Sequence, residues 1–82
     1  MPYAISPAQC RGARGMVGLS QAELAVAARV GASTVKNFEN ERSVPYAKNM
    51  LDIIAALEAA GVEFVEENGG GPGVRLRKAK RR

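Results

Sequence analysis

One stretch of the chain, Leu19 to Glu41 (LSQAELAVAARVGASTVKNFENE), constrains the fold more than any other. Ser20 and Glu23 have the spacing of a capping box, in which the serine oxygen caps the glutamate amide and the glutamate reaches back to the serine amide. This motif predicts a helix over 21–29. After a tight turn, a second helix is predicted over 32–40. The stretch therefore predicts two short consecutive helices.

The apolar residues of these two helices recur at spacings of three and four, which places them on one face of each helix. Val35 and Phe38 are predicted to point inward from the second helix. The opposite face then carries small and polar side chains, as a helix that enters the major groove of DNA requires. The inward residues of the first helix are predicted to be Leu24, Ala25 and Ala28.

Two further helices are predicted to flank this pair. Ser6 and Pro7 suit the N-cap and the first position of a helix over 7–17. Another helix is predicted from Tyr46 or Ala47 to Ala60. The residues expected to face the core are Cys10, Ala13, Met16 and Val17 in the earlier helix, and Met50, Ile53, Ile54 and Leu57 in the later one.

Beyond residue 61 the apolar period shortens from near 3.6 to 2, which is typical of strands. Two strand-like runs are separated by a glycine-rich loop, and we expect a β-hairpin over 61–77. Glu63 is expected to pair with Arg75 or Arg77 across the strands. A lone two-stranded hairpin is marginal in water, so this one is expected to pack on the helices or against a second copy.

These elements predict a mainly α fold, with a four-helix domain over 5–60, the hairpin over 61–77 and a disordered basic tail over 78–82. The formal net charge is +4, but six of the twelve basic residues lie at Arg75 and beyond, so residues 1–74 hold six basic and eight acidic groups, a net charge of −2. The net charge alone therefore does not predict that the folded part binds DNA. The tail is either a nonspecific phosphate contact or a solvated terminus.

The chain has one cysteine and no histidine, which excludes an internal disulfide, a histidine-containing zinc site and a histidine-based catalytic triad. The sequence contains no recognisable pair of nucleophile and base, so we expect no enzyme activity, no cofactor, no metal and no small-molecule ligand. No apolar run approaches the roughly 18 residues of a membrane span. The start of the chain also lacks the features of a signal peptide. We expect a cytoplasmic, nucleoid-associated protein of bacterial type.

The chain resembles the Cro/cI-type helix-turn-helix regulators, also called the xenobiotic-response-element family. The resemblance rests on the Ser-Gln-Ala-Glu-Leu-Ala run from Ser20, on Val35 and on the Phe-Glu-Asn run from Phe38, and it covers about residues 5–60. It implies a compact helical domain that binds double-stranded DNA as a homodimer, usually as a repressor. Arg29 and Gly31 depart from the family pattern, which usually has glycine and then a serine or threonine cap.

The resemblance also implies roles for particular residues. Arg14 and Glu39 match a buried salt bridge that positions the second helix of the motif without touching DNA. The residues expected to contact base edges are Ala32, Ser33, Lys36 and Asn37. Those expected to contact the DNA backbone are Ser20, Gln21, Asn40, Arg42 and Ser43.

A chain of this size builds a modest core, which favours a second subunit. The hairpin is the predicted dimer contact, through Val62, Phe64, Val74 and Leu76, and the predicted operator is an inverted repeat. One alternative of another class stays open. The same helical scaffold serves protein-interaction modules such as antitoxins and anti-activators, and the weakly basic helices are compatible with that function.

Overall fold

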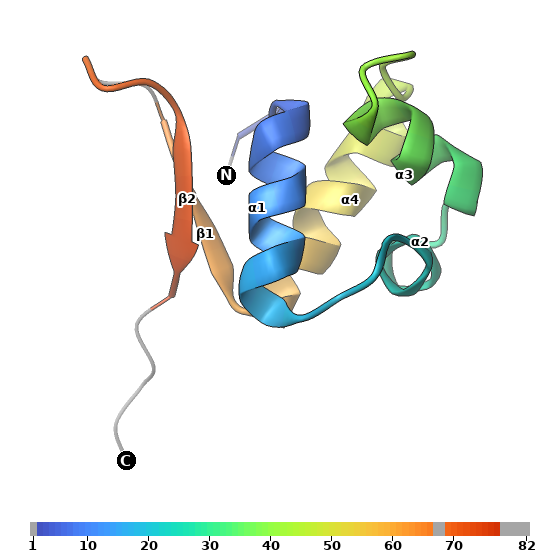
Figure 1. Cartoon of the computed structure of the whole chain (residues 1–82), viewed down its shortest axis with the longest axis horizontal. Helices are drawn as coiled ribbons and strands as arrows, with labels where there is room; N and C mark the ends of the chain where they lie inside the picture. The colour runs from blue at the N-terminus through green and yellow to red at the C-terminus, as the bar shows by residue number, and fades with distance from the viewer. Residues whose placement is uncertain (1, 67–68, 78–82) are drawn as a thin grey trace.

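The computed structural model describes residues 2–66 and 69–77; the predicted basic tail over 78–82 lies outside the described residues. The structure is mainly helical, as predicted, and ends in a two-stranded antiparallel hairpin (Figure 1). Within the described ranges, no helix is long and apolar enough to cross a membrane. The elements are α1 (Pro7–Val17), α2 (Gln21–Ala28), α3 (Ala32–Glu39), α4 (Ala47–Ala60), β1 (Val62–Val65) and β2 (Gly73–Leu76).

The start of α1 is capped more fully than the sequence prediction proposed. Ser6 is the N-cap, and its Oγ accepts a hydrogen bond from the Gln9 amide at 3.0 Å. The Gln9 side-chain oxygen accepts from the Ser6 amide at 2.8 Å, which completes a capping box. Gln9 also donates its Nε2 to the Gly73 carbonyl at 2.9 Å. The same side chain therefore caps α1 and anchors β2 to it.

The core is formed by all four helices together with Ile5 and Val62. One prediction about it is wrong, because Met16 is 44% exposed. Val17, the next residue, is half-buried and packs against the core, so the buried face of α1 runs through Cys10, Ala13 and Val17 and leaves Met16 outside it. The fully or nearly buried residues of the helices are Cys10, Ala13, Leu24, Ala25, Ala28, Val35, Phe38, Met50, Ile53, Ile54 and Leu57.

The hairpin packs against α1 and α4, on the opposite side of α1 from α2 and α3 (Figure 1). Glu63 pairs with Arg75 across the strands, as predicted. Phe64 pairs with Val74, and both pack against the core. A Cβ added to Gly12 of α1 would lie 3.5 Å from the Val74 side chain, so the hairpin sits directly over this glycine.

This packing changes the prediction that four hairpin residues form a dimer contact. Val62 is completely buried in the core of its own chain, and Phe64 and Val74 are half-buried against it. Of the four predicted residues, Leu76 alone is well exposed, at 58%. The apolar side of the hairpin therefore packs on α1 and α4 of its own chain, and a dimer contact through the hairpin stays a prediction.

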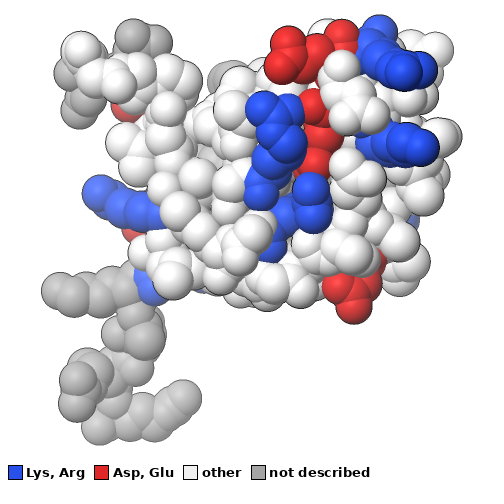
Figure 2. All heavy atoms as spheres, in the orientation of Figure 1, with Lys and Arg blue, Asp and Glu red and all other residues white. Residues whose placement is uncertain are grey.

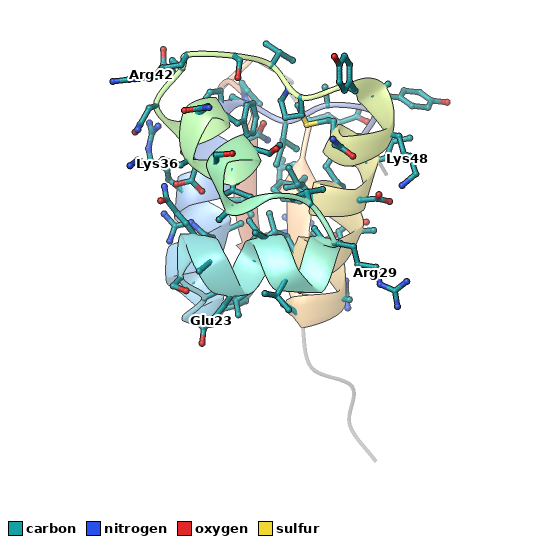
Figure 3. The ribbon with its side chains drawn as sticks, turned by 90° about the vertical axis from the view of Figure 1, so that its right-hand side faces the viewer. Glu23, Arg29, Lys36, Arg42 and Lys48 are labelled. Atoms are coloured by element: carbon teal, nitrogen blue, oxygen red, sulfur yellow. The ribbon has the colours of Figure 1, made fainter. Side chains whose placement is uncertain are left out.

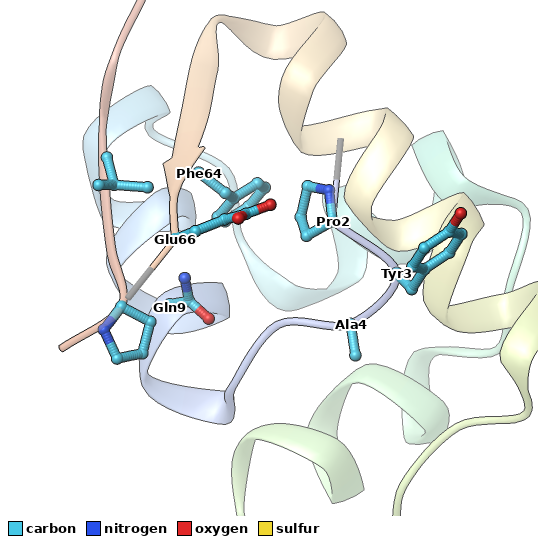
Figure 4. A pocket seen from close by; sticks show the side chains of 8 residues that line it. Pro2, Tyr3, Ala4, Gln9, Phe64 and Glu66 are labelled. Carbon is cyan, nitrogen blue, oxygen red and sulfur yellow. The ribbon is translucent and has the colours of Figure 1, made fainter. Parts of the chain in front are cut away.

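The N-terminal segment and the hairpin enclose a hollow of about 310 Å³. Figure 4 shows Phe64 and Gln9 on one side of this hollow and Pro2 on the other. Because the Gln9 side chain already bonds Ser6 and Gly73, its role here is to fasten the N-terminus of α1 to the hairpin.

Candidate nucleic-acid interface

The helix-turn-helix unit begins with the predicted capping box at α2. Ser20 Oγ accepts from the Glu23 amide at 3.0 Å, and Glu23 Oε1 accepts from the Ser20 amide at 2.8 Å. At the other end of α2, Arg29 has a φ of 59°. It adopts the left-handed conformation for which glycine is usually chosen. The departure at Arg29 therefore leaves the turn with the backbone geometry of a helix C-cap.

The turn passes directly into α3. The Val30 amide donates to the Ala25 carbonyl at 3.0 Å, which closes the end of α2. Val30 is half-buried against the core. Gly31 is the N-cap of α3 and makes no side-chain capping bond. Backbone bonds and the apolar contact of Val30 thus set the angle at which α3 leaves α2.

The ion pair expected between Arg14 and Glu39 is present and nearly buried. Arg14 Nε donates to Glu39 Oε2, and Arg14 Nη2 donates to Glu39 Oε1, both at 2.7 Å. The Glu39 side chain is 1% exposed and that of Arg14 is 20% exposed. This two-pronged geometry is the strongest that an arginine and a carboxylate can form, and it fixes α3 against α1.

Two more side chains donate to the same carboxylate, and the sequence analysis missed both contacts. Gln21 Nε2 lies 3.0 Å from Glu39 Oε1, and Cys10 Sγ lies 3.1 Å from Glu39 Oε2. Cys10 is one helical turn before Arg14, which places both on the same face of α1; that spacing was the available signal. In addition, Arg11 donates to the backbone carbonyl of Glu39 at the end of α3.

These contacts set the protonation states inside the cluster. Burial by itself raises the pKa of Glu39, but hydrogen bonds from Arg14, Gln21 and Cys10 outweigh it and hold that pKa below its ordinary value. Burial, and then the neighbouring Glu39, raise the pKa of the Cys10 thiol. At neutral pH the cluster is therefore a buried carboxylate with donors from α1 and α2, and it locks three helices into one arrangement.

The outer face of α3 carries two of the residues predicted to contact base edges. Lys36 is exposed and Asn37 is half-buried, and neither side chain takes part in a hydrogen bond between residues that the structure describes. The Asn37 carbonyl accepts from the Arg42 amide at 2.8 Å, so the segment after α3 is tied to the helix. The remaining candidate residues lie on the same unit: Ala32, Ser33, Ser20, Asn40 and Ser43 are exposed, and Gln21 is half-buried.

Basic side chains lie on more than one side of this unit, although residues 1–74 carry a net negative charge. Figure 2 shows several of them over α1 and α3 on the face toward the viewer, with acidic side chains among them. In Figure 3, Lys36 and Arg42 lie on one side of the unit, and Arg29 and Lys48 lie on the other. Because the Glu39 carboxylate is buried and paired, it adds little negative charge to the exposed surface beside α3.

A comparison with protein families matches residues 11–64 to the helix-turn-helix family. No curated protein matches the chain. The matched region begins within α1, contains α2, α3 and α4, and ends within β1. It includes the capped start of α2, the turn and the outward face of α3. On this match and this geometry, the chain belongs to the Cro/cI-type helix-turn-helix family, the xenobiotic-response-element family of DNA-binding domains.

Proposed function

We propose that this protein is a sequence-specific transcription regulator, a repressor, that binds an inverted-repeat operator as a homodimer. The observation that carries the proposal is the difference between the two sides of α3. Its inward side is fixed by the buried Glu39 cluster, while the side chains of Lys36 and Asn37 form no hydrogen bond with any other residue that the structure describes. A rigid helix with free polar side chains is what direct readout of bases requires. The proposed place of action is the bacterial-type cytoplasm, where the nucleoid lies.

The base-reading roles follow from the chemistry of the outward face. Asn37 offers an amide that can pair with an adenine edge, and Lys36 can donate to guanine or to a phosphate. Ala32 and Ser33, at the start of α3, are small enough to let the backbone approach the bases. Each good pairing of a side chain with a base contributes about 1–3 kcal/mol of discrimination.

The backbone-contacting roles centre on Gln21 at the first position of α2. One N–H of its amide donates to Glu39, and the second N–H is left for a phosphate oxygen. The helix amides beside it favour an anion as well. Asn40, Arg42 and Ser43 follow α3 and provide further donors to the opposite phosphates. The hydrogen bond to Glu39 therefore fixes the position of Gln21 relative to α3.

The experiment that tests the proposal is a selection from random duplex DNA at physiological salt with the full-length protein. The expected result is a single inverted-repeat sequence. Recovery of no preferred sequence, with only salt-sensitive binding that disappears when residues 78–82 are removed, would overturn the proposal in favour of a protein-interaction module.

A matched pair of variants tests the face that reads the bases. Lys36→Ala combined with Asn37→Ala is expected to lower affinity for the selected duplex by about 100-fold, as the loss of roughly two side-chain contacts predicts. The control is Lys48→Ala, on the other side of the unit (Figure 3), where Lys48 bonds Asp52 at 2.8 Å. Equal affinity of the two variants for the selected duplex would exclude this face of α3.

A further inference from the structure

The two arginines of α1 lie beside the end of α3 and differ in how far the fold uses them. Arg14 donates through Nε, Nη1 and Nη2 to Glu39 and to the Leu19 carbonyl, and its side chain is only 20% exposed. Arg11 is exposed, and Nη1 donates to the backbone carbonyl of Glu39. Among the residues that the structure describes, the Arg11 side chain makes no other hydrogen bond. The fold therefore occupies Arg14 and leaves most donors of Arg11 for a ligand.

The remaining donors of Arg11 suit a phosphate group. A guanidinium carries five N–H donors in one rigid plane. With Nη1 on the Glu39 carbonyl, the edge formed by Nε and Nη2 stays without a partner in residues 2–66 and 69–77. Two parallel N–H groups on one edge match two oxygens of a phosphate. In the same ranges no ion pair joins Arg11 to a carboxylate, so no direct contact neutralises its charge.

The bond to Glu39 fixes the place of the Arg11 guanidinium. The accepting carbonyl belongs to the last residue of α3, and the proposed backbone contacts Asn40 and Arg42 follow soon after it. The carboxylate of the same residue accepts from Gln21 at 3.0 Å. Glu39 therefore holds Arg11 of α1 and Gln21 of α2 at set positions relative to α3. A side chain that is already held loses less conformational freedom when it binds a ligand.

The surface beside Arg11 is open to a large partner. Gly15 lies one helical turn after Arg11 on the same side of α1. No neighbour lies within 4 Å of a Cβ added to Gly15, so nothing in the fold covers this side of the helix. Lys36 and Arg42 lie at the left of Figure 3, which is the face toward the viewer in Figure 2, where basic side chains of α1 and α3 appear together. A duplex against the outer face of α3 therefore brings its backbone toward α1 as well.

We propose that Arg11 is a further DNA-backbone contact, which holds one phosphate through Nε and Nη2 while Nη1 stays on the Glu39 carbonyl. This inference rests on the proposed function, because that function places the duplex against α3. It extends the interface from the helix-turn-helix unit to the middle of α1. A phosphate contact positions the protein on DNA and carries no sequence information. Arg11 thus adds affinity for any duplex and leaves the preferred sequence unchanged.

The test compares Arg11→Gln with Arg29→Gln in the full-length protein. Both variants remove one positive charge from an exposed arginine, and Arg29 lies on the other side of the unit from Lys36 and Arg42 (Figure 3). Fluorescence anisotropy measures affinity for the selected duplex between 50 mM and 200 mM salt. Each phosphate contact accounts for about a threefold loss of affinity over that range. For each copy bound, Arg11→Gln is therefore expected to lose about threefold less affinity than the unaltered protein, which Arg29→Gln should match.

A further readout separates DNA binding from a structural role of Arg11. An arginine that bonds the last carbonyls of a helix also stabilises the end of that helix. If this were its whole role, Arg11→Gln would lower the melting temperature and weaken binding by the same factor at every salt concentration. Arg11→Lys keeps the charge and is expected to keep the salt dependence of the unaltered protein. Equal salt dependence of Arg11→Gln and Arg29→Gln would overturn the phosphate contact.

The failure of this inference and the failure of the proposed function are distinguishable. The preference of the unaltered protein for the selected duplex over an unrelated one tests sequence-specific binding. The comparison of Arg11→Gln with Arg29→Gln tests the phosphate contact, and it can be made on either duplex. Arg11→Gln is expected to keep the ratio of the two affinities. A changed ratio would assign Arg11 to base reading and would overturn the inference as stated.

Discussion

The helix-turn-helix unit and the hairpin use their exposed surfaces in opposite ways. In the unit, the buried side of α3 carries the polar cluster around Glu39, and the other side carries Lys36, which is exposed, and Asn37, which is half-buried. In the hairpin, the apolar side chains of Val62, Phe64 and Val74 pack inward. Its outer side carries a solvent-exposed ion pair. In the helix-turn-helix unit, buried polar contacts therefore fix the orientation of α3. The hairpin, by contrast, chiefly covers apolar surface of α1 and α4.

The two ion pairs show the difference in numbers. Arg14 and Glu39 meet at 2.7 Å with side-chain exposures of 20% and 1%. Arg75 and Glu63 meet at 3.3 Å with exposures of 66% and 43%. A surface pair of the second kind contributes at most about 1 kcal/mol, since water solvates both ions well. A buried pair matters more because removal of one partner strands the other.

The largest expected effect tests whether the packing of the hairpin on α1 and α4 is needed for the fold. Val62→Asp places a charge in a fully buried site and is expected to cost more than about 4 kcal/mol, enough to unfold a small domain. Leu76→Asp, at an exposed end of the same sheet face, is expected to change the free energy of unfolding by less than about 0.5 kcal/mol. Urea denaturation followed by circular dichroism measures both. A folded, monomeric Val62→Asp protein would instead restore the hairpin as the dimer contact.

The next effect compares the two ion pairs directly. Glu39→Gln removes a charge that Arg14, Gln21 and Cys10 all contact, and we expect a loss of about 3 kcal/mol in the free energy of unfolding. Glu63→Gln, the matched substitution in the hairpin, should cost less than about 0.5 kcal/mol. Equal losses in a urea titration would contradict the assignment of orientation to the Glu39 cluster.

The dependence of stability on pH should follow Glu39 as well. Its pKa is lowered in the folded protein, while in the unfolded chain it is about 4.3. The stabilisation is therefore present above pH 4.3 and is lost as pH falls through that value toward the lowered folded pKa. Thermal melting between pH 7 and pH 3 should show a decline that is shallower in Glu39→Gln. If the melting temperatures of the two proteins fell in parallel with pH, other carboxylates would be responsible for the loss of stability in acid.

The smallest effect compares the turn of the unit with the entrance to the hairpin. Arg29→Gly is expected to stabilise by several tenths of a kcal/mol, because glycine adopts a φ of 59° without steric cost. Gly61 has a φ of 121°, a region that side chains rarely enter, and no neighbour lies within 4 Å of an added Cβ. Gly61→Ala should therefore cost about 1–2 kcal/mol from backbone strain alone. Thermal melts that shift in the same direction for both variants would contradict this reading.

Sequence prediction succeeded where the interacting residues are close in the chain and failed where they are distant. The capping box at Ser20 and the apolar pattern from Met50 to Leu57 are signals within a few residues, and the structure confirms both. Met16 was assigned to the wrong face, because the apolar spacing along a helix does not show how much of its surface the neighbouring elements cover. The contacts of Glu39 with Gln21 and Cys10 join residues that are distant in the chain. The spacing of Cys10 and Arg14 places both on one face of α1, but no local pattern says that Glu39 lies opposite that face.

The sequence by itself determined the four helices, their caps, the turn and the polar outward face of α3, because each depends on backbone preferences and apolar period within one or two turns. The tertiary structure alone decided what those elements cover. It turned the apolar side of the hairpin onto α1 and α4, gathered four donors on one buried carboxylate, and left Val44 and Tyr46 exposed beside α3. Burial depends on which elements meet, and that choice is made by the whole chain at once.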